Sequence, residues 1–369
     1  MRPAVLGAAA LGMVPFRVSA PPSPGWWRSQ ATAHSALVTV LVLALLVASL
    51  VQSAAVDSWQ PSSVAGVLLL ARRIHGPLLW AGAVVWAWRR PTQLQAFFTA
   101  CRQHEAQFGA LDLRSSARYV RRFVAALLLV LVFCVVLVLV TVSGAPAWLQ
   151  LVSVMPLVSV YGGVIFWVAV FIGCCWCLQE ALGALDGHLQ TALDGSLGPA
   201  AGGAGAALIG GGTELRQLRL LVRRHGELSR LVELLSDTFG GFISFYLYML
   251  MLDVALSVYL NLRPFSAPLP SSLGMLLLHS LLTPLPLILL KLATNAGQGL
   301  GRQTRRAAGL LRRRLPSAEP ELAELLHLLE GQQTSLDMAG YFTLDSTFFI
   351  QSLKDVVTLL IVMAQFEMA

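Results

Sequence analysis

Long apolar runs alternate with polar, arginine-rich stretches along the whole chain. Most of these runs approach the length, about 20 residues, at which an α-helix crosses the hydrocarbon core of a bilayer. Because hydrocarbon offers no partner to backbone N–H and C=O groups, the runs predict membrane helices rather than loops or open strands. The predicted spans are residues 36–51, 64–88, 123–142, 149–178, 239–260, 271–292 and 347–366.

Two of the polar stretches contain leucines at helical spacing. Thr213 can cap a helix in which Leu218, Val222 and Leu228 share one face and arginines lie between them. Pro320 opens a second helix with Leu322 and later leucines on one face. Both patterns predict amphipathic helices outside the bilayer, each with one face packed on a partner.

The composition places the protein in a membrane. Of the 369 residues, 56% are hydrophobic and only 12% are charged, and the mean hydropathy is +0.70. Such a chain has too few polar residues to cover a water-facing surface. The 26 lysines and arginines outnumber the 19 acidic residues, for a formal net charge of +7, and they gather in alternate polar stretches. By the positive-inside rule, this bias predicts seven spans with the N-terminus inside and the C-terminus outside.

Several other classes of protein fit the sequence less well. A G-protein-coupled receptor has the opposite charge bias, and a transporter usually carries repeated halves, which this chain lacks. The arginine clusters carry no interleaved aromatic platform of the kind that single-strand binders use, so no nucleic-acid partner is expected. No phosphate loop, metal-ligand helix or nucleophile elbow occurs, so we expect neither an enzyme nor a cofactor. The cluster Cys174, Cys175 and Cys177 favours helix packing or acylation over a metal site.

The last span ends in a short motif. Thr358 and Leu359 are followed by five hydrophobic residues and then by Gln365 and Phe366. This run resembles the signature of insect gustatory receptors, Thr-Tyr, five hydrophobic residues and Gln-Phe, with Leu359 in the place of the Tyr. The preceding run Gly340-Tyr341-Phe342-Thr343-Leu344-Asp345 is similar to the Gly-Phe-Phe-Thr-Leu that commonly leads into that helix.

The residues alone allow two interpretations of Gln365 and Phe366. They fit an amide and an aromatic anchor at the membrane surface, or a gate in which copies of the chain form polar and apolar rings. The resemblance implies the gate: a tetrameric, ligand-gated, non-selective cation channel whose last helix lines one pore. The narrowest point would then lie at Gln365 and Phe366, with Met363 as a further apolar ring.

The resemblance also implies an organisation and a set of partners. The fold is an all-α polytopic membrane protein with a plasma-membrane location in the dendrites of gustatory neurons. Its partners are a small-molecule tastant, further copies or related gustatory subunits, and the lipid bilayer. The implied regions are a flexible basic cytoplasmic tail at 1–35, six spans with a ligand-binding outer bundle at 36–292 including a cytoplasmic loop at 179–238, cytoplasmic anchor helices at 293–346, and the pore-lining span at 347–366.

A tastant is expected in the outer half of the bundle, between spans two to six. Asp253 is the sharpest candidate, because a carboxylate within a span is costly unless it pairs or meets water. An ion pair between Asp253 and Arg72 and a direct ligand contact both remain open. The candidate ligand-binding residues are Arg72, His75, Tyr161, Asp253, Tyr259 and His279.

Overall fold

A computed structural model describes residues 33, 36–44, 47–48, 51, 64–108, 114–141, 143, 163–196, 211–262, 284–314, 320–331, 335–338 and 340–368. This part of the chain is helical apart from one isolated antiparallel bridge, so the prediction of an all-α fold is confirmed. The helices discussed here are α3 (Val64–Arg89), α4 (Pro91–Phe108), α5 (Arg114–Thr141), α7 (Gly163–Ser196), α8 (Gly211–Leu262), α10 (Pro284–Arg314), α11 (Pro320–Gly331) and α12 (Ser346–Met368).

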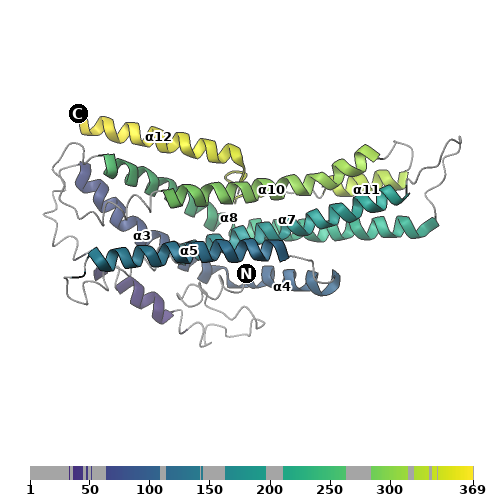
Figure 1. The fold of residues 1–369 in the computed structure, drawn as a ribbon, viewed down its shortest axis with the longest axis horizontal. Coiled ribbons are helices and arrows are strands. Elements are labelled where there is room, and N and C mark those ends of the chain that lie inside the picture. The colour runs from purple at the N-terminus through teal and green to yellow at the C-terminus, as the bar shows by residue number, and fades with distance from the viewer. Residues whose placement is uncertain are drawn as a thin grey trace.

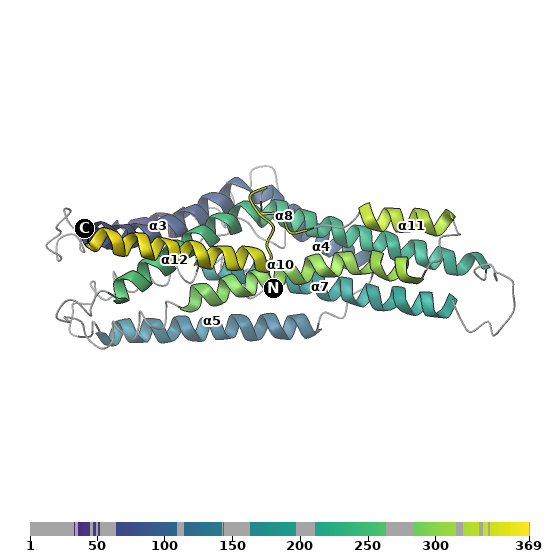
Figure 2. The same ribbon diagram turned by 90° about the horizontal axis from the view of Figure 1, so that it is seen from above.

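The helices form an elongated bundle (Figures 1 and 2). The C-terminus of α12 lies at one end, on the left in Figure 1, and α11 lies at the other. We call these the α12 end and the α11 end. α8 contains 52 residues and would be about 78 Å long at 1.5 Å per residue, so this one helix runs along most of the bundle. α12 covers only the half of the bundle nearest its own end (Figures 1 and 2).

Four helices in the described part of the chain are long and apolar enough to cross a membrane: Arg118–Val140, Phe166–Leu193, Arg216–Leu256 and Ser346–Gln365. In the α7 and α8 segments, 67% of the most apolar window is buried inside the protein, against 17% in the α5 and α12 segments. α7 and α8 are therefore central, and α5 and α12 leave most of their apolar surface open on the outside.

An aromatic cluster joins α3, α7 and α8. Trp86 stacks on Phe242 with ring centroids 4.7 Å apart and meets Trp167 edge-on at 5.1 Å. Phe239 lies against both tryptophans, at 5.4 and 6.0 Å. Contacts at these distances and angles are the favourable geometries of aromatic pairs, so the cluster fixes the crossing of the three helices.

Three helices continue through the predicted boundaries between spans and loops. α7 passes residue 178, α8 passes residue 238 and α10 passes residue 292 without a break. The leucine faces predicted in the polar stretches are confirmed, since Leu218 and Leu228 of α8 and Leu325 and Leu329 of α11 are buried. Residues 1–32, 149–162 and 271–283, which include the predicted tail and parts of two spans, lie outside the described residues.

Candidate functional site

A small hairpin precedes α12. Asp337 and Thr343 form an antiparallel bridge, and the N–H of Met338 donates to the carbonyl of Phe342 at 2.8 Å. Gly340 has a φ of +79°, which glycine adopts without a steric penalty, and its N–H donates to Asp337 Oδ1 at 3.1 Å. The run that leads into the last span is therefore a tight turn closed by backbone hydrogen bonds.

The hairpin is attached to α8 by two buried hydroxyls. Ser236 Oγ donates to the carbonyl of Asp337, and Ser244 Oγ donates to the carbonyl of Met338 at 3.2 Å. Met338 itself is fully buried. Because buried carbonyl groups need a partner, Ser236 satisfies the carbonyl of Asp337, while Ser244 adds a second contact to the carbonyl of Met338, which also accepts from the N–H of Tyr341 at 3.1 Å.

The first turn of α12 is held by its own cap and by α10. Asp345 Oδ1 accepts from the N–H of Phe348 at 3.0 Å, which is the hydrogen bond of an N-cap residue. Gln298 of α10 donates to the Ser346 hydroxyl at 3.1 Å. A Cβ added to Gly297 would lie 2.5 Å from the carbonyl oxygen of Leu344, so the backbone of α10 lies directly against both the backbone and the side chain of Leu344 at this point.

The outer part of α12 packs through one apolar face. Val356 and Met363 are 7% and 6% exposed, and Leu359 and Leu360 flank them. The main partners lie on α8 and include Met251, Val254, Ala255, Leu256 and Tyr259. The side chains that α12 contributes to this cluster are apolar, so dispersion and apolar contact are the main attraction between this part of α12 and α8.

The opposite face of α12 is exposed and carries a polar stripe. Gln351, Thr358 and Gln365 are all exposed and are spaced seven residues apart, so they point in nearly the same direction along the helix. Ile361, between two of them, is 54% exposed. A helix that packs through its apolar face and opens its amides and hydroxyl to the outside can line a water-filled path.

The predicted gate residues fall on different faces. Gln365 lies on the exposed stripe, and Thr358 lies on the same stripe with its hydroxyl donating to the carbonyl of Lys354 at 2.9 Å. Met363 faces α8 instead, as does Leu359, so neither points along the stripe. Phe366 follows within α12, and its side chain lies outside the described residues.

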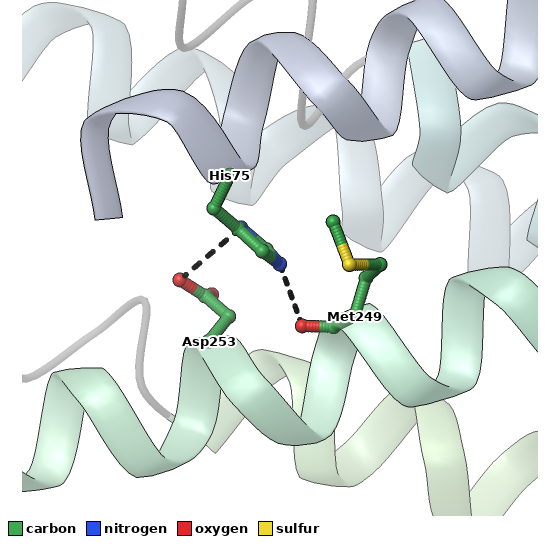
Figure 3. A network of polar contacts seen from close by, with 3 residues as sticks. All are labelled: His75, Met249 and Asp253. Atoms are coloured by element: carbon green, nitrogen blue, oxygen red, sulfur yellow. Dashed lines mark hydrogen bonds and ion pairs between the residues drawn. The ribbon is translucent and has the colours of Figure 1, made fainter. Parts of the chain in front are cut away.

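His75 of α3 and Asp253 of α8 meet inside the bundle. His75 Nε2 lies 2.6 Å from the carbonyl oxygen of Met249, and Nδ1 lies 3.9 Å from Asp253 Oδ1 (Figure 3). A carbonyl only accepts, so the imidazole carries a proton on Nε2 and turns Nδ1 toward the carboxylate. The His75 and Asp253 side chains are only 5% and 10% exposed, so this contact between α3 and α8 is a buried polar network.

The remaining ligand candidates are spread over the bundle. Tyr259 is 5% exposed and belongs to the cluster that holds α12. Arg72 lies in α3, one turn before His75, but its side chain is outside the described residues. Tyr161 and His279 lie outside the described part altogether. Within it, His75 is the partner found beside Asp253.

A polar cleft that the sequence did not suggest lies between α4 and α8, outside the α12 half. It has a volume of about 520 Å³ and is lined by His104 of α4 and by Arg223, Glu227 and Arg230 of α8, among others. Burial, reinforced by the nearby Arg224, lowers the pKa of His104, and Glu227 partly opposes the shift. The lining residues recur at helical spacing on each helix, a signal visible in the sequence only once the two helices are known to be neighbours.

Comparisons with known proteins give one family and one fold. The family model described as 7tm chemosensory receptor matches residues 1–369. The solved structure of the insect olfactory receptor OR5 from Machilis hrabei in complex with eugenol is similar, with a TM-score of 0.71, 12% identity, and 99% of this chain and 97% of that chain covered. The structure of the same receptor described without eugenol has a TM-score of 0.69, 12% identity and the same coverage. A comparison with curated protein sequences finds no match.

Proposed function

The chain belongs to the 7tm chemosensory receptor family, and we propose that it is a gustatory receptor that forms a ligand-gated, non-selective cation channel as a tetramer. The observation that carries this proposal is the exposed polar stripe of α12. A stripe of two amides and one hydroxyl along the exposed face of a membrane helix is costly against lipid and favourable against water. If four copies surround one axis, the stripe of each copy faces a water-filled path at the centre.

The gate lies at the outer end of the stripe. Gln365 forms the polar ring, and Phe366 forms the apolar constriction beside it. An apolar ring that is narrow enough to dewet stops ions, and widening it lets hydrated cations pass. Met363 affects this gate indirectly. It packs α12 against α8 on the side away from the pore and so sets the position of Gln365.

The ligand is a small organic molecule that acts near the His75–Asp253 network. The Machilis receptor of the same fold was solved with eugenol, and a small organic ligand of that kind is the class proposed to act near the buried pair His75–Asp253. Asp253 lies in the same stretch of α8, residues 251–259, that holds α12. A ligand that competes for His75 or Asp253 would shift this stretch, and α12 would follow.

The charge bias supports a multi-pass orientation with the N-terminus and the α11 end in the cytoplasm and the C-terminus outside. The plasma membrane of gustatory dendrites is the proposed location. A tag on the C-terminus should then react with an impermeant label on intact cells, and reaction only after permeabilisation would contradict this orientation.

Cysteine cross-linking tests the shared pore without any knowledge of the tastant. In a Gln365→Cys variant treated with copper phenanthroline, copies of the chain should become linked through disulfides between neighbouring α12 helices. Val356→Cys, which faces α8, is the matched control and should link no more than the unmodified chain with its five native cysteines. Equal linking of both variants, or none, would contradict a pore lined by the stripe.

A further inference from the structure

Two opposite charges flank the polar stripe of α12. Lys354 precedes Thr358 by four residues and Asp355 precedes it by three. At 3.6 residues per turn, Lys354 therefore lies about 40° to one side of Thr358 and Asp355 about 60° to the other. The two side chains are both exposed, and they differ in height along the helix by only about 1.5 Å.

Neither charge has an ion-pair partner within the described residues of its own chain. Asp355 accepts a hydrogen bond from the Gln351 amide at 3.1 Å, which leaves its negative charge uncompensated. The two side chains point apart, so they do not neutralise each other. Charges within a membrane span are usually paired with one another or placed in water, and the described part of this chain supplies no ion-pair partner for either charge.

The symmetry of a ring supplies that partner. This step rests on the proposed function, in which four α12 helices surround one axis with the stripe facing it. In a fourfold ring, the two neighbours of each helix lie about 45° to either side of the line from that helix to the axis. Lys354 then points toward one neighbour and Asp355 toward the other, and the same holds for every copy.

We propose that Lys354 of each copy pairs with Asp355 of the adjacent copy, so that four identical ion pairs close the ring of α12 helices below the gate. The occupant of this surface is a second copy of the chain, identified by the complementary charge on its opposite flank. The pairs fix the rotation of α12 about its own axis, which is what directs Gln365 toward the pore. They also leave the inner part of the pore with no net charge, so the amides and the hydroxyl of the stripe face the ions.

Charge reversal on two differently tagged chains tests the pairing. A chain with Lys354→Asp has two carboxylates at these positions, and a chain with Asp355→Lys has two ammonium groups. Expressed alone, each should lose assembled tetramer by about fivefold or more relative to the unmodified chain, because like charges meet at every interface. Expressed together, the two chains should alternate around the ring, recover the tetramer and co-purify through either tag.

A double variant, Lys354→Asp with Asp355→Lys, keeps the complementarity within one chain and should assemble as the unmodified chain does. Equal assembly of every variant would mean that water or lipid solvates both charges, and it would overturn the pairing. The cross-linking of Gln365→Cys separates the two proposals. If that cross-link forms and charge reversal has no effect, the pairing fails alone; if it is absent, the shared pore fails and the pairing falls with it.

Discussion

The two ends of α12 are held by different kinds of interaction. At its start, the hairpin, the Asp345 cap, the two serines of α8 and the amide of Gln298 make directional hydrogen bonds. Toward its end, Val356 and Met363 make apolar contacts only. Hydrogen bonds between buried groups define one position, whereas apolar contacts tolerate sliding and separation. The difference predicts a helix that is fixed at its first turn and moves more readily at its C-terminal end.

The largest expected effect is at the fixed end. Gly297→Ala puts a Cβ where the carbonyl oxygen of Leu344 lies 2.5 Å away, so either α10 or the hairpin must shift. We expect a loss of about 3 kcal/mol in the free energy of unfolding, the upper range for overpacked sites. Thermal unfolding of the detergent-solubilised protein measures this loss.

Gly301→Ala is the control on the same helix, because nothing lies within 4 Å of the added Cβ. It should be neutral or slightly stabilising, since alanine is the better helix former. Equal melting temperatures for the Gly297 and Gly301 variants would contradict a tightly fixed inner end.

The next effect is at the moving end. Met363→Ala removes a side chain that is 6% exposed from the cluster between α12 and α8. Large-to-small changes at buried sites lower the free energy of unfolding by about 2 to 5 kcal/mol. We expect a loss of about 2 kcal/mol here, because lipid can partly fill the space. Because this contact packs the C-terminal part of α12 against α8, the proposed channel should also pass a larger current without ligand, measured by patch clamp.

Ile361→Ala, on the exposed face, should cost less stability, because the side chain is 54% exposed in the single chain. If the Ile361 and Met363 variants had the same basal current and stability, packing against α8 would not be what restrains the outer end.

A smaller effect is expected at the cap. Asp345→Ala removes the acceptor for the N–H of Phe348 and should cost about 1 kcal/mol. Asp345→Asn keeps a side-chain oxygen and should cost only a few tenths of that amount. Melting temperatures of the two variants measure the difference, and a cap that contributes nothing would give identical values.

The smallest effect is expected at a site that touches neither end of α12. Because burial lowers the pKa of His104, the folded chain binds a proton there less readily than the unfolded chain, whose histidines titrate near 6.5. The stability from neutral His104 is complete above about pH 6.5 and is lost as the pH falls. His104→Gln should therefore reduce the drop in melting temperature between pH 7.5 and 5.5. His188→Gln, on the exposed surface of α7, is the control, and an equal change in both variants would exclude a specific role of His104.

The sequence predicts the helices well because their apolar faces recur at the helical period. Leu218 and Leu228 in α8 and Leu325 and Leu329 in α11 are buried as that period indicates. The prediction is weaker for α12, where Val357 and Ile361 are exposed although they are as apolar as the buried Val356. Both faces of α12 carry apolar residues, so composition alone does not show which face packs against α8. The orientation of Met363 toward α8 therefore did not follow from the motif.

The candidate ligand site depends in the same way on contacts between distant parts of the chain. Arg72 and His75 lie one turn apart on α3, and either could have reached Asp253 at the predicted depth. Only the crossing of α3 over α8, fixed by the aromatic cluster around Trp86 and Phe242, brings the imidazole to the carboxylate. The hairpin could not be predicted from the sequence either, because its hydrogen bonds use backbone groups and two serines that are 94 or more residues away in sequence.

The two serines that receive the hairpin also enclose the most deformable point of α8. Gly240 and Gly241 lie midway between Ser236 and Ser244, and a pair of glycines in the middle of a helix lowers its resistance to bending. The hairpin is hydrogen-bonded to α8 on both sides of the two glycines, and it therefore stiffens α8 there. These two attachments should limit bending of α8 at the glycines, so that a displacement of residues 251–259 would be passed on to α12.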